Sequence, residues 1–285
     1  MGKYTALDKR MKRYEASSDI CLTRRTPVIL RFDMCAGHTF TKGFEKPFDI
    51  MFMSAMQKTM LSLCESIQGC VFGYTQSDEI TLVLCDYKTL ETDAWFDYRL
   101  EKLCSVGASK ASRFFNKHFM ELVEKRISIE STDAFNDMMK KISKTFLPED
   151  AWGKPSGIPK LPYGMADLYK RRFFEADFDC RAFNIPKEEV CNCIIWRQND
   201  AEKNSVQSLA QSMYSQRELN GIKTNQLQNK MFTEKGVNWN ELDTMCKRGT
   251  ACKKNSEGAW EVDYEMPIVK KNRAYVEDLV YCEED

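Results

Sequence analysis

The sequence predicts an α+β fold built around a βαββαβ unit, and two observations support this. Three apolar, β-branched segments have the composition of buried strands: 27–33, 70–74 and 80–85. Two longer segments, 51–67 and 94–119, place apolar residues at helical spacing. The resulting order of strand, helix, hairpin and helix is the first part of a ferredoxin-like βαββαβ fold.

The remaining elements follow from local signals. Residues 4–16 predict a short amphipathic helix that docks on the rest of the protein. Asp93 is a suitable N-cap for the helix over 94–119. The segment 173–186 is predicted to be the strand that returns to the sheet, and Pro186 opens a long helix.

Composition narrows the possible classes of protein. The 285 residues contain 42 Lys and Arg and 42 Asp and Glu, so any polyanion must be attracted by a local basic patch. No apolar segment approaches the roughly 20 residues that cross a membrane, and the N-terminus lacks the apolar core of a signal peptide. We therefore expect a cytoplasmic protein that does not coat DNA and does not bind a membrane.

The twelve cysteines are scattered through apolar surroundings, which favours reduced thiols in the core. Cys191 and Cys193 form a single C-x-C pair without a second pair at zinc-ribbon spacing. His38 and His118 are the only histidines, which excludes a metal cage made of several histidines. A structural zinc site is therefore disfavoured.

Acidic residues lie at the ends of the predicted strands. Asp33 follows the first strand, and Asp78 and Glu79 occupy the turn of the hairpin. Each of these carboxylates, taken alone, is also an ordinary turn residue. Because the strands would be neighbours in a βαββ unit, we expect the carboxylates to meet at one end of one sheet. Paired carboxylates can hold two Mg²⁺ ions, the arrangement used for in-line nucleotidyl transfer.

Several polar residues could bind the rest of a nucleotide. Lys46 precedes a helix and could reach a phosphate at its N-terminus. Arg99 and Lys102 are three residues apart and could hold a triphosphate, or could simply face water. The polar face that begins at Trp196 suits hydrogen bonding to sugars and phosphates.

Together these segments resemble the tRNA-His guanylyltransferase family, and most closely its bacterial and phage branch of guanylyltransferase-like 3′–5′ polymerases. The motifs occur in order between about residues 5 and 254: RFD…HTFTKGFEKPFD, GYTQSDEITLVL, WF…R..K….AS and WRQND….NS. The resemblance implies a polymerase palm that adds nucleotides to the 5′ end of tRNA. It also implies two Mg²⁺ ions, with ATP or GTP as activating and substrate nucleotides.

The resemblance assigns roles to individual residues. By motif match, Asp33 and Asp78 would bind both ions with the carbonyl of Met34, and Glu79 would support them as the third catalytic carboxylate. The residues implied to surround the nucleotide are Met34, Cys35, Ala36, Gly37, His38, Lys46, Asp49, Ser77, Arg99 and Lys102. Arg197 and Asn204 would contact RNA.

The resemblance also implies a division of the chain and an assembly. Residues 1–185 would form the palm-type catalytic domain, with the N-terminal helix and a proline-rich excursion near 127–165. Residues 186–285 would form a C-terminal helical region that completes the fold and contributes to RNA binding. Family members are typically homotetramers that bind tRNA or tRNA-like RNA and nucleoside triphosphates.

The chain departs from the family pattern at two places. The pattern D-G-x-x-F-H is replaced by DMCAGH, with Met34 at the glycine and Gly37 at the aromatic residue. The glycine permits close backbone approach to metal and phosphate, and the aromatic residue would pack near the base. The HINNLYN motif of members dedicated to tRNA-His is replaced by EKNSVQS at 202–208. We therefore expect repair of truncated tRNA 5′ ends.

Two other functions remain open on the sequence. Met34 and Gly37 favour a catalytically impaired homologue that only binds RNA. A palm-type nucleotide cyclase or synthetase could use the same two-metal site without RNA, but the chain lacks the glycine-rich turn expected of that class.

Overall fold

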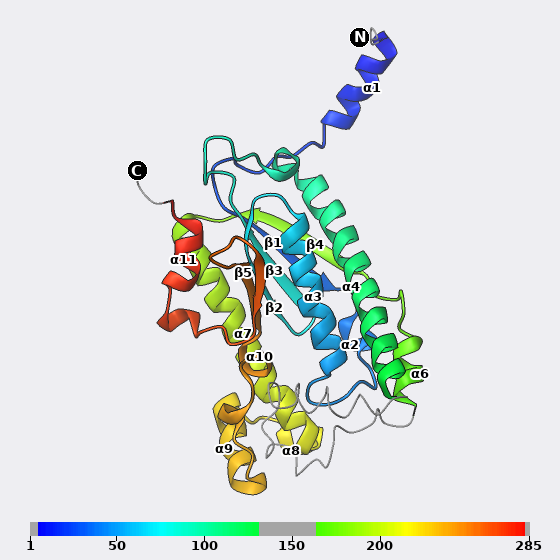
Figure 1. Cartoon of the computed structure of the whole chain (residues 1–285), viewed down its shortest axis with the longest axis vertical. Coiled ribbons are helices and arrows are strands. Elements are labelled where there is room, and N and C mark those ends of the chain that lie inside the picture. Colours follow the sequence, from blue (N-terminus) through cyan, green and yellow to red (C-terminus); the bar gives the residue numbers. More distant parts are fainter. Residues whose placement is uncertain (1–4, 131–163, 283–285) are drawn as a thin grey trace.

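A computed structural model describes residues 5–130 and 164–282 of the chain. It contains a six-stranded antiparallel sheet in the order β4-β1-β3-β2-β5-β6 (Figure 1). The strands are β1 (Val28–Met34), β2 (Cys70–Gln76), β3 (Glu79–Leu84), β4 (Phe178–Asn184), β5 (Thr250–Lys254) and β6 (Trp260–Asp263). The chain order β1-α3-β2-β3-α4-β4 is the predicted βαββαβ unit, which confirms the α+β fold class.

One face of the sheet is covered by α3 (Ile50–Ser66) and α4 (Leu100–Glu130), which run side by side across it (Figure 1). Every second residue of β1 points into this core, and Val28, Leu30 and Phe32 are completely buried there. The four rings of Phe40, Phe44, Phe115 and Phe119 pack edge-to-face or stacked. Residues of β1 with the opposite parity, beginning with Ile29, face the other side.

The second face of the sheet is covered by α7 (Lys187–Met213) and α11 (Ala274–Val280). Ile29, Phe72 and Val83 of the sheet pack there against Val190 and Ile194 of α7. The C-terminal half of α7 then enters a third hydrophobic cluster together with α9 (Thr224–Lys235) and α10 (Thr244–Arg248). The chain therefore uses both faces of one sheet, and α7 connects the second face to the C-terminal helices.

The shorter elements connect these layers. They are α2 (Gly37–Phe40), η1 (Trp95–Tyr98), α6 (Met165–Lys170), α8 (Gln216–Leu219), η2 (Trp239–Glu241) and η3 (Val269–Lys271). None of the helices within the described ranges is long and apolar enough to cross a membrane.

The structure corrects the predicted start of α4. Asp93 does not cap it, because Phe96, Asp97 and Tyr98 have positive φ angles and separate η1 from the helix. α4 begins at Leu100 instead, and it extends to Glu130, beyond the predicted end. The predicted loop over 147–165 lies almost entirely outside the described residues.

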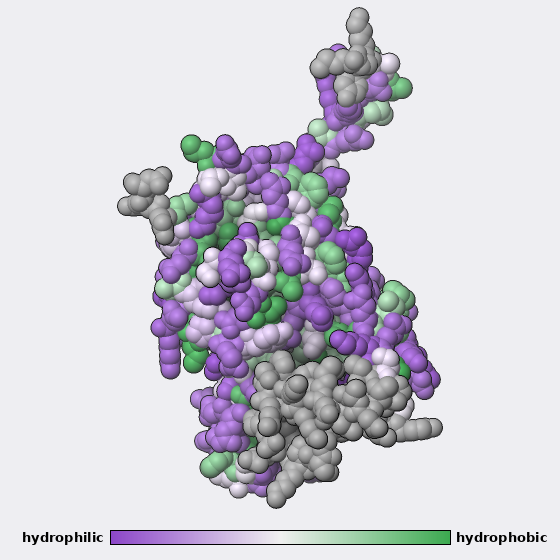
Figure 2. Space-filling view, viewed as in Figure 1, coloured by the Kyte–Doolittle hydropathy of each residue, from purple (hydrophilic) through white to green (hydrophobic). Residues whose placement is uncertain are grey.

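The N-terminal helix is present but does not dock. α1 (Ala6–Ala16) begins with a capping box in which Thr5 and Asp8 bond each other's backbone N–H groups. It contains no buried residue, and Leu7, Met11 and Tyr14 are 56, 44 and 69% exposed. α1 stands away from the body with hydrophilic and hydrophobic residues both exposed (Figure 2). The predicted docking of this helix on the catalytic domain is therefore wrong within one chain.

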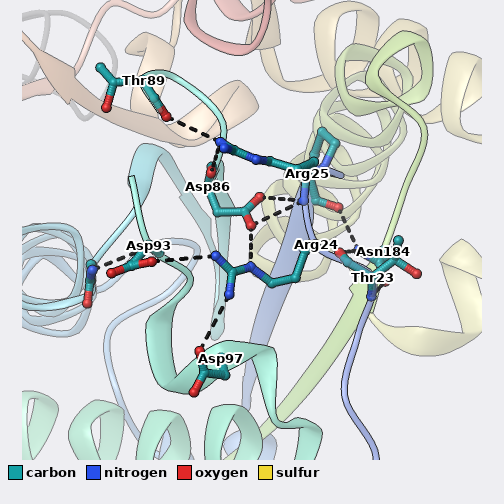
Figure 3. Close-up of polar contacts among 10 residues, drawn as sticks. Thr23, Arg24, Arg25, Asp86, Thr89, Asp93, Asp97 and Asn184 are labelled. Carbon is teal, nitrogen blue, oxygen red and sulfur yellow. Dashed lines mark hydrogen bonds and ion pairs between the residues drawn. The ribbon is translucent and has the colours of Figure 1, made fainter. Parts of the chain in front are cut away.

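A polar network centred on Asp86 ties the start of β1 to the end of β3 (Figure 3). The Asp86 carboxylate is completely buried and accepts hydrogen bonds from Arg24 Nε at 2.7 Å and from the Arg25 backbone N–H at 2.9 Å. The Arg25 guanidinium donates to the Asp86 and Thr89 carbonyls. Asp97 also approaches Arg24, at 3.4 Å, but its side chain is 81% exposed. Asp86 is therefore the buried partner that fixes where β1 begins.

Asp86→Asn should destabilise the protein much more than Asp97→Asn. The amide at position 86 loses a charge-assisted hydrogen bond in a buried setting, which costs about 1–3 kcal/mol. The exposed pair at position 97 should contribute about 0–1 kcal/mol. Urea unfolding of the two variants measures the difference, and equal free energies of unfolding would show that the buried carboxylate does not hold this end of the sheet.

Candidate active site

The C-terminal end of β1 and the β2–β3 turn meet at one edge of the sheet. Asp33 is the register partner of Glu79, and the Met34 N–H donates to the Asp78 carbonyl at 3.1 Å. Asp179 of β4 is the register partner of Asp33 on the other side. Residues opposite each other in antiparallel strands point to the same face, so Glu79, Asp33 and Asp179 form one acidic row. The predicted meeting of the carboxylates at one end of the sheet is observed.

The charges in this row repel one another. Partial burial raises the pKa of Asp33, and the nearby charges of Asp78 and Asp179 raise it further. Arg181 and Arg31 act in the opposite direction. Asp33 and Asp78 therefore lie close enough to interact electrostatically, although they approach from different segments.

The donor set suits a hard divalent cation. Asp33 and Asp78 offer carboxylate oxygens, and the backbone of Met34 offers a carbonyl, all of which are ligand types that Mg²⁺ prefers. Within residues 5–130 and 164–282, no three His, Cys, Asp or Glu side chains form a group that could hold a metal ion. The two carboxylates and the carbonyl fit Mg²⁺ in chemistry, and the ion would have to draw them together.

Gly37 lets the Asp78 side chain lie against α2. A Cβ atom at position 37 would collide with Asp78 Oδ2 and would also be 3.0 Å from Asp78 Cγ. Gly37 itself is buried in the first turn of α2, directly after Ala36, which has a φ of 52°. The glycine that replaces the family's aromatic residue therefore makes room for a candidate metal ligand.

The Met34 side chain points away from the site. It is 3% exposed and belongs to the core under α3 and α4. Its backbone continues the sheet as the register partner of Phe178. Cys35 follows with an exposed side chain, and its N–H donates to the Asp177 carbonyl at 2.8 Å. Substitution of the family's glycine by Met34 therefore adds bulk to the core and none to the face that carries Asp33.

Glu79 is held by a buried arginine of α7. Arg197 is 7% exposed, and its guanidinium lies 3.3 Å from Glu79 Oε2 and 2.6 Å from Asp200 Oδ2. Burial raises the pKa of Glu79, while Arg197 and then Arg31 oppose that rise. Arg197 therefore fixes a carboxylate from beneath the surface, and its predicted contact with RNA stays a prediction. Asn204, the other predicted RNA contact, is exposed on the same helix.

A cavity of about 200 Å³ opens beside the acidic row on the α7 side of the sheet. Its lining residues are Arg31, Asp33, Glu79, Arg181, Trp196 and Arg197. The residues predicted from the sequence did not include Arg31, Asp179 or Arg181, whereas Trp196 begins the polar face that was predicted to suit sugars and phosphates. The alternation of charged with less polar residues in FDCRAF (178–183) marks a strand with one solvent-facing side and could have indicated Asp179 and Arg181.

Comparison with known proteins decides the family. A family model described as tRNAHis guanylyltransferase matches residues 8–145. A bacterial tRNA(His) guanylyltransferase (Thg1)-like protein, solved with ATP, is 36% identical over 97% of this chain and 100% of its own, with a TM-score of 0.74. The chain belongs to the tRNA-His guanylyltransferase family. The family resemblance expected from the motifs is confirmed.

Two further relatives agree with this assignment. A bacterial guanylyltransferase-like structure solved with GTP is 33% identical and covers 97% of this chain and 100% of its own, with a TM-score of 0.71. The tRNA(His) guanylyltransferase of Saccharomyces cerevisiae is 24% identical over 246 residues, which are 81% of this chain and 83% of the yeast protein. The similarity to family members therefore covers most of the chain.

Some residues implied by the family motifs lie at the loop that follows β1. His38 is exposed on α2, Lys46 is exposed before α3, and Ser77 is exposed in the β2–β3 turn with a φ of 50°. All three side chains are accessible to solvent. Their role in holding a nucleotide stays a prediction.

Asp49 has a different place from the one implied by the family motif. It is 6% exposed and accepts hydrogen bonds from Tyr169 Oη at 2.6 Å, from Phe52 N–H at 2.9 Å and from Glu45 N–H at 3.1 Å. Burial raises its pKa, and these hydrogen bonds oppose the rise. Asp49 caps α3 and anchors the loop from beneath, so its carboxylate does not face a nucleotide.

Arg99 and Lys102 are not brought to this site within one chain. The Arg99 guanidinium lies 3.1 Å from Asp19 Oδ2, and its backbone pairs with Cys21. These partners precede β1, whereas Asp33 lies at the other end of that strand. The predicted role of Arg99 and Lys102 in holding a triphosphate therefore gains no support from this arrangement.

Gly37→Ala tests the packing of Asp78 on α2. The added methyl group must displace the Asp78 carboxylate, the flexible end of a side chain, so the fold should tolerate it. We expect a melting temperature close to that of wild type and roughly 10–100-fold weaker Mn²⁺ binding, the usual effect of disturbing the support of a metal ligand. Electron paramagnetic resonance titration with Mn²⁺ measures the affinity. Unchanged binding would show that the Asp78 position does not depend on this glycine.

Asp33→Asn should stabilise the metal-free protein at pH 7. Because folding raises the pKa of Asp33, its stabilising contribution is full below the unfolded-state pKa and is lost as pH rises through the folded-state value. The ionised carboxylate is therefore unfavourable at pH 7, and the amide removes this cost. Thermal unfolding in EDTA at several pH values should show a higher melting temperature for the variant at pH 7, with a gap that narrows towards about pH 4.

The surface variant Asp97→Asn serves as the control for this pH series. An Asp33→Asn protein that melts below wild type at pH 7 without metal would contradict the electrostatic account of the acidic row.

Proposed function

We propose that this protein is a Mg²⁺-dependent nucleotidyltransferase that adds nucleotides to the 5′ end of tRNA, in the 3′–5′ direction. Family membership supports transfer of nucleotides to tRNA, and the relatives solved with ATP and GTP support nucleoside triphosphates as substrates. The single observation that carries the proposal is the meeting of Asp33 and Asp78 at one sheet edge, beside an open cavity.

The proposed reaction has two steps. The 5′-phosphate of the RNA is first activated by ATP or GTP, with pyrophosphate as the leaving group. The 3′-hydroxyl of an incoming nucleoside triphosphate then attacks the phosphorus of the activated RNA 5′-phosphate. The activating nucleotide leaves as its monophosphate. When bound, two Mg²⁺ ions would neutralise phosphate charge and lower the pKa of the attacking hydroxyl.

The residues of the chain would supply position and charge. Asp33, Asp78 and the Met34 carbonyl would hold the ions, and Glu79, fixed by Arg197, would keep the local charge negative. Lys46 and His38 would approach the triphosphate from the loop after β1. Alignment of the two substrates and stabilisation of developing charge are the main contributions that we assign to the protein.

We propose repair of incomplete 5′ ends as the physiological role. Residues 202–208 lie on α7 and read EKNSVQS, so the motif of members dedicated to tRNA-His is absent from this helix. Asn204 is exposed there and could contact RNA, together with the rest of the C-terminal region. From the resemblance we further propose a homotetramer located in the cytoplasm.

The alternative of an impaired homologue rests on Met34 and Gly37. Both residues are accommodated: the Met34 side chain is in the core, and Gly37 makes room for Asp78. These positions therefore favour a competent enzyme.

Asp78→Ala tests the proposed activity. Purified wild-type protein with Mg²⁺, labelled nucleoside triphosphates and a 5′-truncated tRNA should extend the RNA at its 5′ end, as sized on a gel. Loss of a metal ligand should lower the rate at least about 10³-fold. Asp97→Ala, an exposed carboxylate at the other end of the sheet, should keep the wild-type rate. Absence of any 5′ extension by the wild-type protein with all four nucleotides would overturn the proposed function.

A further inference from the structure

Two arginines lie directly opposite each other beside the acidic row. Arg31 of β1 and Arg181 of β4 are register partners, two residues before Asp33 on β1 and two residues after Asp179 on β4. Like charges at directly opposed positions destabilise a sheet. Arg181 lies 3.9 Å from Asp179, an exposed pair that offsets little of this repulsion. A pair that lowers stability in this way indicates a function that requires concentrated positive charge.

An exposed tryptophan completes this surface. Trp196 of α7 is 53% exposed, and its ring lies 5.6 Å from the Arg31 guanidinium and 4.0 Å from that of Arg197. Arg197 is more than nine-tenths buried, and its Nε has no hydrogen-bond partner among the described residues. A half-exposed indole ring beside two guanidinium groups, at the mouth of a cavity, offers a flat surface on which a base can stack.

The position of this surface relates it to the acidic row. Arg31, Arg181 and Trp196 lie on the α7 side of the sheet, together with Asp33 and Glu79, and line the same cavity. The loop that carries His38 and Lys46 instead leads into the core on the α3 side, through Phe40 and Phe44. The end of β1 therefore has a basic, aromatic surface on one side and a separate basic loop on the other.

We propose that Arg31, Arg181 and Trp196 form a second nucleotide site, which binds the phosphorylated 5′ end of the RNA. Arg31 and Arg181 hold the 5′-phosphate beside Asp33, and the terminal base stacks on Trp196. The chemistry of the site, guanidinium groups for phosphate and an aromatic ring for a base, would also accept a free nucleotide. The proposal rests on the proposed function, because it places the acceptor of that reaction.

The choice of the RNA end over a free nucleotide follows from the arrangement of the two sides. In-line transfer places the attacking 3′-hydroxyl and the leaving nucleotide on opposite sides of the phosphorus, so the incoming triphosphate and the RNA 5′ end must approach the metal ligands from different directions. If the loop after β1 takes the incoming triphosphate, the α7 side remains for the acceptor. The cavity of about 200 Å³ is open and small, which suits the end of a chain that continues into solvent.

Equilibrium binding without turnover tests the proposal. The probes are a 5′-monophosphorylated RNA hairpin, the same hairpin with a 5′-hydroxyl, and ATP alone, each titrated into the full-length protein in Ca²⁺. The variants are Arg181→Ala and Trp196→Ala. Matched controls are Lys117→Ala, an exposed cation on α4 across the sheet, and Phe232→Ala, an aromatic residue on α9 that is 60% exposed.

We expect Arg181→Ala to weaken binding of the phosphorylated hairpin roughly tenfold and to lower the slope of log affinity against log salt by about 0.7, the value for one lost phosphate contact on a single strand. The 5′-hydroxyl hairpin should bind both proteins equally. Trp196→Ala should weaken both hairpins by roughly tenfold through lost stacking. The melting temperature of the RNA-free Arg181→Ala protein should be no more than about 2 °C below that of wild type, since the substitution removes an exposed ion pair and also relieves the repulsion between Arg31 and Arg181.

Two outcomes overturn the proposal. Affinities for the phosphorylated hairpin that match those of the control variants would exclude the site. A loss confined to ATP would assign the site to a free nucleotide and refute the RNA assignment. Because binding is measured without turnover, a wild-type protein that binds the hairpin as expected but extends no RNA would refute the proposed reaction and leave this site standing.

Discussion

The site depends on the register of β1 between β3 and β4. In that register Asp33 lies opposite Glu79 and Asp179, and Arg31 lies opposite Thr81 and Arg181. Side chains alternate strictly between the faces of a strand, so a slip of one residue would send Asp33 into the phenylalanine-rich core and bring Phe32 to the surface. The apolar residues of β1 therefore fix the chemistry as well as the fold, because burying them places Asp33 on the opposite face of the sheet, beside the cavity.

This register places like charges opposite each other, which lowers the stability of the sheet. Burial raises the pKa of Asp33, and the charges of Asp78 and Asp179 raise it further. Beside the acidic row, Arg31 and Arg181 lie opposite each other and form a basic row. Arg197 relieves part of the first repulsion by pairing with Glu79 from α7. A fold selected only for stability would have no reason to keep either row. Bound cations and phosphates would satisfy both rows at once, which makes the pair of rows a stronger indication of a nucleotide site than either carboxylate alone.

The sequence was informative where local patterns coincide with the family motifs. The apolar strands, the long helices and the hairpin predicted the βαββαβ order, and the family motifs indicated Asp33 and Asp78. The features that the sequence could not show depend on contacts between distant segments. Asp49 has the same sequence context whether it faces a nucleotide or caps a helix, and only Tyr169, 120 residues away, decides the matter. Arg197 is in a polar motif, yet its partner Glu79 is 118 residues distant. The start of α4 was misplaced because three positive φ angles carry no glycine signal.

The departures from the family pattern at Met34 and Gly37 have one physical explanation. A glycine after the first aspartate would leave the core under α3 without the Met34 side chain, whereas a bulky residue at position 37 would meet the Asp78 carboxylate. In this chain the small residue is in the first turn of α2 instead of at the strand end. The large residue is in the core instead of in the loop. The close backbone approach in this chain is between α2 and the Asp78 carboxylate. The two substitutions therefore act as one rearrangement of volume, and their effects on the site should be considered as a pair.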